Sequence, residues 1–140
     1  MNPLRLDSIQ SSICKEQAEL FEMAAIQGLD CDRFVAFYMN SSTATGMDSE
    51  FDHSQWAGAG YLMEELEDAA NGLPRSDEIY DPEAMYWMGY LYRYWHFYTG
   101  ESSKEIYKRV DAATMALIYP GYHTLDPQEA IDRLLEPLGG

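Results

Sequence analysis

The chain has few cysteines, no leader-like N-terminus and no long apolar run. Its two cysteines, Cys14 and Cys31, are too few for the disulfide framework of a secreted scaffold. The first ten residues lack the basic and apolar blocks of a signal peptide, and no segment approaches the roughly 20 apolar residues of a membrane span. We therefore expect a cytoplasmic protein with reduced thiols and no membrane-spanning segment.

Basic residues are also scarce. Nine Lys and Arg face 24 Asp and Glu, for a formal net charge of −15. Binding to nucleic acid or to an anionic membrane requires Lys and Arg to displace counterions or meet phosphate groups. The composition therefore disfavours direct contact with either, and the expected partners are cationic or neutral.

Signatures of catalysis and of metal binding are missing. The chain has no HExxH, CxxC or GxSxG motif, and its three histidines are scattered. Asp48, Glu50 and Asp52 alternate as in the first half of a calcium loop, but His53 stands where that loop needs glycine and Ala59 where it needs the bidentate glutamate. We expect no metal and no cofactor, and the missing motifs favour a non-enzymatic protein over an enzyme.

Apolar residues are plentiful: 46% of the 140 residues are hydrophobic and 14% are aromatic. This composition offsets the entropy lost on folding, and the length is typical of one domain. Apolar residues at helical spacing, with capping residues before them, predict an all-α single domain of six or seven helices around a central aromatic helix. Helices are expected at residues 7–28, 31–47, 54–72, 81–98, 104–110, 113–119 and 130–136, the last ending at Pro137.

The sequence also leaves one alternative open and predicts the structure of three particular positions or segments. A strand at residues 34–39 is the alternative to the second helix, and residues 41–45 are interpreted as a helix end or turn. Trp56 is expected on the buried side of the third helix. Residues 119–124, YPGYHT, are expected to form a loop between two helices, either covering the core or making contacts with a partner.

The helix at 81–98 is apolar on nearly every side, which is typical of a helix at the centre of a bundle. Gly89 would let a neighbouring helix approach closely. Arg93 lies within this apolar helix, so its guanidinium needs a carboxylate or carbonyl partner to offset lost hydration. We expect that partner in the acidic segment that precedes the helix.

That acidic segment, residues 48–83, carries eleven carboxylates and one base, Arg75. Asp81 and Glu83 are assigned to starting the aromatic helix, together with Pro82. The remaining candidates for binding a basic protein partner are Glu64, Glu65, Glu67, Asp68, Asp77 and Glu78. A solvated surface that only aids solubility is the simpler interpretation of such a charge run.

A second hypothesis places a small ligand, or an enzyme site, in a pocket on the aromatic helix. Its candidate ligand-binding residues are Tyr86, Tyr90, Arg93 and His96. This arrangement requires Arg93 to face an open cleft, where it would bind an anion. An internal ion pair of Arg93 without an adjacent cavity would remove the hypothesis.

Residues 103–135, SKEIYKRVDAATMALIYPGYHTLDPQEAIDRLL, resemble small uncharacterised bacterial proteins encoded in clusters that look like toxin–antitoxin modules. The likeness rests on the KEIY start, the YPGY turn and the capped last helix. It implies an accessory or neutralising role in a bacterial cytosol. Together with the charge, it predicts a non-enzymatic interaction protein, in its sharpest form an antitoxin or inhibitor that competes with nucleic acid for a basic groove.

Overall fold

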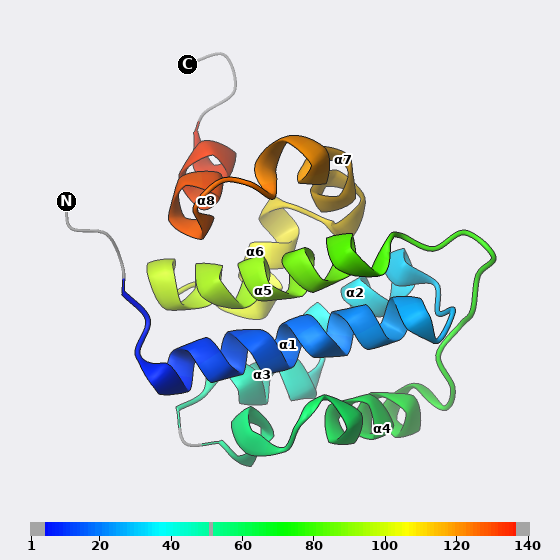
Figure 1. Cartoon of the computed structure of the whole chain (residues 1–140). Helices are drawn as coiled ribbons and strands as arrows, with labels where there is room; N and C mark the ends of the chain where they lie inside the picture. The colour runs from blue at the N-terminus through cyan, green and yellow to red at the C-terminus, as the bar shows by residue number, and fades with distance from the viewer. Residues whose placement is uncertain (1–4, 51, 137–140) are drawn as a thin grey trace.

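The computed structural model describes residues 5–50 and 52–136, and within them the fold is an all-α bundle, as predicted (Figure 1). Pro137, expected to end the last helix, lies outside the described residues. The elements are α1 (Ser8–Ile26), α2 (Cys31–Met39), α3 (Ser42–Asp48), the 3-10 helix η1 (His53–Trp56), α4 (Ala59–Ala70), α5 (Pro82–Thr99), α6 (Ser103–Arg109), α7 (Ala112–Tyr122) and α8 (Pro127–Leu135).

Local capping signals determine where most helices start. The side chains of Asp7 and Ser102 form capping boxes with Gln10 and Glu105, and Asp81 caps α5 ahead of Pro82. These interactions satisfy amide groups that the first helical turn leaves unpaired. The predicted starts of these helices are therefore confirmed.

Helices α1 and α5 lie side by side and antiparallel through the middle of the molecule (Figure 1). Gly89 of α5 makes this possible: a Cβ at that position would lie 2.7 Å from the backbone oxygen of Gln17 and 3.0 Å from the Cα of Ala18. The close approach predicted for Gly89 is confirmed. The ring of Phe21 then packs edge-on against Tyr38 at 5.5 Å between ring centroids, which fixes α2 against the same pair.

Two helix boundaries differ from the prediction. The expected helix at 54–72 is divided, because Gly58 has φ +92°, a conformation that no helix contains. Trp56 consequently falls in η1 and is 57% exposed, so its predicted place in the core is wrong. The expected helix at 31–47 is also divided, into α2 and α3, because Ser41 starts a new helix by accepting the Ala44 N–H. Residues 42–45, interpreted as part of a helix end or turn, therefore lie in α3.

The loop predicted at 119–124 is largely helical, since α7 continues through Pro120 to Tyr122. Aromatic contacts stabilise this last turn. Tyr119 packs against Trp87 of α5 with ring centroids 5.6 Å apart, and its ring stacks on His123 at 4.5 Å. The Nδ1 of His123 also donates to the Tyr119 carbonyl at 2.8 Å. These tertiary contacts outweigh the cost of a proline near the end of a helix.

Candidate functional site

Arg93 is the centre of a buried polar network. Its side chain is fully buried, and its NH1 donates to Asp48 Oδ1 at 2.5 Å. Its Nε and NH2 donate to the Gln17 side-chain oxygen at 3.0 and 2.8 Å, and NH2 also reaches Ser103 Oγ at 3.0 Å. The prediction that Arg93 pairs with a carboxylate of the acidic segment is confirmed, and the carboxylate is that of Asp48.

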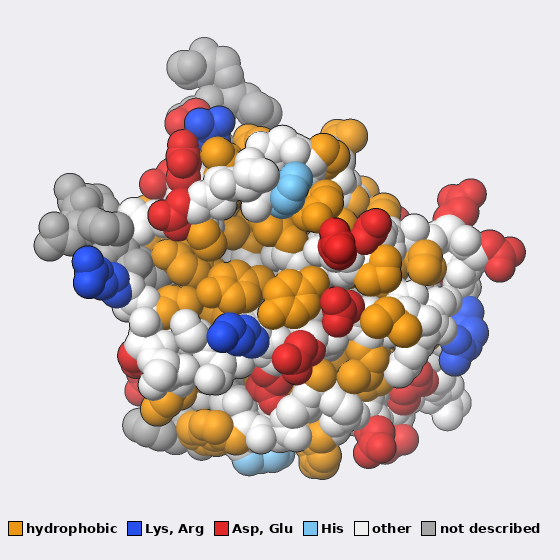
Figure 2. All heavy atoms as spheres, viewed as in Figure 1, with side chains coloured by type: hydrophobic (Ala, Val, Ile, Leu, Met, Phe, Trp, Pro, Cys, Tyr) orange, Lys and Arg blue, Asp and Glu red, His pale blue; other side chains and the backbone are white. Residues whose placement is uncertain are grey.

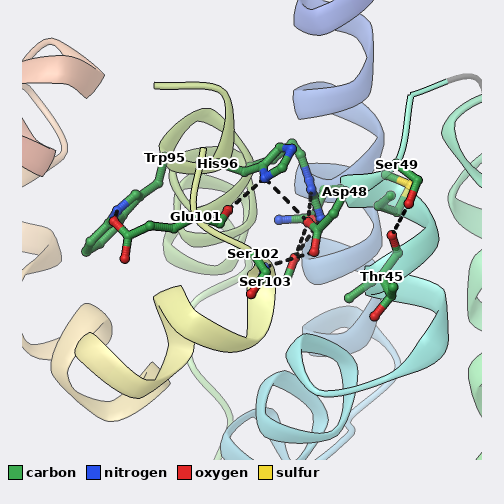
Figure 3. A network of polar contacts seen from close by, with 12 residues as sticks. Thr45, Asp48, Ser49, Trp95, His96, Glu101, Ser102 and Ser103 are labelled. Atoms are coloured by element: carbon green, nitrogen blue, oxygen red, sulfur yellow. Dashed lines mark hydrogen bonds and ion pairs between the residues drawn. The ribbon is translucent and has the colours of Figure 1, made fainter. Parts of the chain in front are cut away.

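The remaining contacts of this network join five helices, and Figure 3 shows the part around Asp48 and Ser103. Asp48, at the end of α3, accepts the backbone N–H of Ser103 at 2.9 Å and so holds the start of α6. Gln17 of α1 donates to the carbonyl of Gly89 on α5 at 2.8 Å. Tyr38 of α2 donates to the Gln17 oxygen at 2.6 Å, and burial raises the pKa of this phenol to about 12, so it stays a neutral donor. The network therefore acts as a structural clamp, meaning that its hydrogen bonds hold the helices of the bundle together.

The pocket hypothesis named Tyr86, Tyr90, Arg93 and His96, and these residues do not converge. Arg93 points into the core, and its N–H groups donate to Asp48, Gln17 and Ser103. His96 lies on the side toward Asp48, with Nδ1 3.8 Å from Asp48 Oδ1, and donates from Nδ1 to the Glu101 carbonyl at 2.7 Å. Tyr86 and Tyr90 lie one turn apart on α5 and are half-buried. Arg93 therefore presents no donor to a ligand.

A cavity of about 430 Å³ does lie beside His96. Its walls combine apolar side chains of α1, η1 and α5 with the carboxylates of Asp7, Asp48 and Glu50. Neither Arg93 nor the two tyrosines line it. An anionic ligand, as the pocket hypothesis required, would meet three carboxylates here and, among the described residues, no Lys or Arg side chain.

The six predicted partner-binding carboxylates fall into two groups. Glu65 accepts the hydroxyl of Thr43 at 2.6 Å, and Glu67 accepts the backbone N–H of Leu73 at 3.1 Å, so both hold the fold together. Within the described residues, no hydrogen bond or ion pair involves the other four side chains, and all four are exposed. We call these four the acidic face: Glu64, Asp68, Asp77 and Glu78.

The segment that carries Asp77 and Glu78 is anchored at its start. Asp30 N–H donates to the Pro74 carbonyl at 2.9 Å, and Ser76 N–H donates to the Gly28 carbonyl at 3.1 Å. Arg75, the one base of the acidic segment, donates to the carbonyl of Gln27. Two of the four carboxylates thus stand on an anchored loop and two on α4.

A surface hollow of about 400 Å³ opens beside α4. The side chains of Met63, Glu64, Glu67 and Asp68 line it together with Gln27. An apolar floor with carboxylates around it suits the aliphatic stem and the charged head of a Lys or Arg side chain. No base lines this hollow.

A second surface feature was not predicted: tyrosines occupy every fourth position of α5. We call Tyr86, Tyr90, Tyr94 and Tyr98 the tyrosine row. Residues four apart share one face of a helix, and the rings of Tyr90 and Tyr94 stack with centroids 6.5 Å apart. The spacing was visible in the sequence, but the apolar residues on every side of α5 hid which face stays uncovered.

Glu16 of α1 is a buried carboxyl, 8% exposed, and it bridges to the start of α4. Its Oε1 accepts the N–H of Gly58, whereas its Oε2 has no hydrogen-bond partner. Burial raises the pKa of Glu16 above its ordinary value. A raised folded-state pKa means that the charged form lowers stability above that pKa, and that this cost disappears as pH falls through it.

Replacing Glu16 with Gln should therefore stabilise the protein at pH 7, by about 1 kcal/mol on the usual scale of point mutants. The amide oxygen can still accept from Gly58, and no charge is buried. Urea unfolding of both proteins at pH 7, 6, 5 and 4 measures the difference. We expect it to shrink as the pH falls and the wild-type carboxyl is neutralised. A difference that grows toward pH 4 would contradict this account of Glu16.

Among the described residues, no group of three His, Cys, Asp or Glu side chains could hold a metal ion. No helix in this part of the chain is both long and apolar enough to cross a membrane. Cys14 and Cys31 are both buried and unpaired, and burial raises the pKa of the Cys14 thiol to about 12. No protein-family model, curated protein or solved structure matches the chain.

Proposed function

We propose that this chain is a non-enzymatic interaction protein that binds a basic protein partner through its acidic face. The observation that carries the proposal is the hollow beside α4, where Glu64, Glu67 and Asp68 surround Met63 without any base. Asp77 and Glu78 extend the same charge along the loop that follows α4. A partner's Lys or Arg side chain would seat in the hollow.

Charge on such a face acts mainly on the rate of association. Complementary potentials steer two proteins together and reject partners of like charge, whereas affinity depends more on a few desolvated anchors. Because the acidic face is exposed, salt screens it within about 8 Å at physiological ionic strength. The proposal therefore predicts association that is fast at low salt and slows as salt is added.

In its sharpest form, the proposal is that the chain neutralises a toxin or nuclease by covering a nucleic-acid groove. The resemblance of residues 103–135 to proteins of toxin–antitoxin-like clusters supports this form, and a row of carboxylates can compete for the Lys and Arg side chains that bind phosphate. Neutralisation is measured as rescue of growth when both proteins are produced in one cell.

Neutralising the acidic face should slow association about tenfold or more at low salt while leaving the fold intact, because none of the four side chains holds another residue. The variant carries Glu64→Gln, Asp68→Asn, Asp77→Asn and Glu78→Gln. A matched control removes four charges from scattered exposed positions, with Glu50→Gln, Glu83→Gln, Asp126→Asn and Glu136→Gln. Glu65 and Glu67 remain, since their hydrogen bonds stabilise α3 and the end of α4.

The partner is first captured from the native host with the wild-type chain and with both variants as bait. A partner retained by the wild type and the control but lost by the acidic-face variant is then purified for stopped-flow kinetics from 20 to 500 mM salt. Equal association rates for all three proteins at low salt would refute the proposal. A captured partner that is itself acidic would refute it as well.

A further inference from the structure

The tyrosine row runs along α5, where Tyr86 and Tyr90 are partly exposed, Tyr94 is buried and Tyr98 contacts α8. In Figure 2, a band of hydrophobic side chains follows α5 across the visible face, between α1 on one side and α7 and α8 on the other. Tyr86, Tyr90 and Tyr98 are half-buried, and Tyr94 is 6% exposed. From its first to its last tyrosine the row is about 18 Å long, since an α-helix rises 1.5 Å per residue.

Carboxylates stand at both ends of this row. Glu19 and Glu22 of α1 lie beside Tyr86, and their charges, after burial, raise the pKa of its phenol. At the other end, Tyr98 donates to Asp132 of α8 at 2.6 Å. Lys15 is the one base on this stretch of α1, so the charge along the row is net negative.

This combination of groups matches cations that carry apolar surface. Aromatic faces attract Lys and Arg through cation–π interactions, and tyrosine is among the residues that most often anchor protein interfaces. The row follows α5, with α1 on one side of this helix and α7 and α8 on the other (Figure 1). An amphipathic helix of about 12 residues covers the same length, and such helices commonly bind in grooves between other helices.

We propose that the tyrosine row, with Glu19, Glu22 and Asp132 at its ends, is the docking surface for a basic amphipathic helix of the partner protein. The proposal rests on the function proposed above and gives the acidic face and the tyrosine row different roles in binding. The acidic face speeds the encounter, and the row holds the docked helix by burying its apolar side chains. Loss of the row should therefore raise the dissociation rate with little change in the salt dependence of association.

The test uses an 18-residue helical peptide with leucine on one face and lysine on the other. A matched peptide carries glutamate in place of lysine. In protein with ¹³C-labelled tyrosine rings, we expect the Lys/Leu peptide to shift the ring signals of Tyr86 and Tyr90, and the Glu/Leu peptide to leave them unchanged. Tyr107, which is half-buried on α6 and belongs to neither proposed surface, provides the internal reference that should not shift.

Two kinds of variant test the affinity. Tyr86→Ala combined with Tyr90→Ala should weaken binding of the Lys/Leu peptide at least tenfold, and Tyr107→Ala should not. Because the tyrosine pair is half-buried, a second variant leaves it untouched: Glu19→Lys with Glu22→Lys puts positive charge beside Tyr86 and should weaken binding to a similar degree. Circular dichroism and urea unfolding check that each variant is folded.

Three results would overturn the inference. The first is peptide binding that leaves the ring signals of the row unchanged, the second is equal binding of both peptides, and the third is sedimentation showing that a second copy of the chain buries the row. If the row variants bind normally while neutralising the acidic face still slows association with the native partner, the inference fails and the proposed function stands. If the row variants weaken binding while neutralising the acidic face leaves association unchanged, the row remains a docking surface and the proposed role of the acidic face is refuted.

Discussion

Replacing Arg93 with Met is expected to lower the free energy of unfolding by about 3–5 kcal/mol, the usual cost of breaking a buried ion pair by removing one partner. Met fills a similar volume, so the loss comes from the groups left behind. Asp48, whose side chain is 13% exposed, would lose its guanidinium partner. The Gln17 oxygen would lose the two donors from Arg93. Urea unfolding followed by circular dichroism measures the change.

The matched control is Arg133→Met. Arg133 pairs with Glu129 at 3.0 Å on the surface of α8, with both side chains about half exposed. Exposed pairs of this kind contribute a few tenths of a kcal/mol. A loss below 1 kcal/mol for Arg93→Met, or equal losses for the two variants, would show that the Arg93 network is not the clamp described above.

Replacing Gly89 with Ala should cost about 2 kcal/mol or more, although alanine favours helix by nearly 1 kcal/mol over glycine. The new Cβ would lie 2.7 Å from the Gln17 backbone oxygen and 2.9 Å from the Phe21 ring. Because the first of these atoms belongs to the backbone of α1, the helix itself must move. That movement also weakens the hydrogen bond from Gln17 to the Gly89 carbonyl.

Gly60→Ala is the control for this substitution. Gly60 lies in the first turn of α4, and nothing stands within 4 Å of the Cβ that alanine would add. Alanine there should leave stability unchanged or raise it by up to about 1 kcal/mol. Thermal unfolding of both variants compares the two sites, and a Gly89→Ala protein as stable as the wild type would contradict the close packing of α1 on α5.

Most helices were predictable because their signals are local. Asp7, Asp81 and Ser102 cap helices through groups only two or three residues away, so the chain's own order contains the interaction. The misplaced boundaries have a different origin. Gly58 is followed by a helical pattern that hides its positive φ, and α7 continues past Pro120 because Tyr119 packs against Trp87 of another helix.

The candidate sites divide in the same way. The sequence located the acidic segment and showed that Arg93 needed a carboxylate, but Asp48 could be chosen only by the fold, since 45 residues separate the two. The sequence could not show that Glu65 accepts a hydrogen bond from Thr43 and that Glu67 accepts one from the Leu73 amide. Those partners come from other elements, and burial and pairing are properties of the folded arrangement.

By itself, then, the sequence determined the all-α class, the helix starts, the concentration of negative charge and the need to neutralise Arg93. The tertiary structure alone decided which carboxylates remain available and which side of α5 stays uncovered. The tyrosine spacing is present in the chain, but α5 is apolar all round. Only the packing of α1, α7 and α8 around α5 decides that Tyr86 and Tyr90 stay partly exposed while Tyr94 is buried (Figure 1). A helix's own pattern cannot specify its exposed face when every face can be buried.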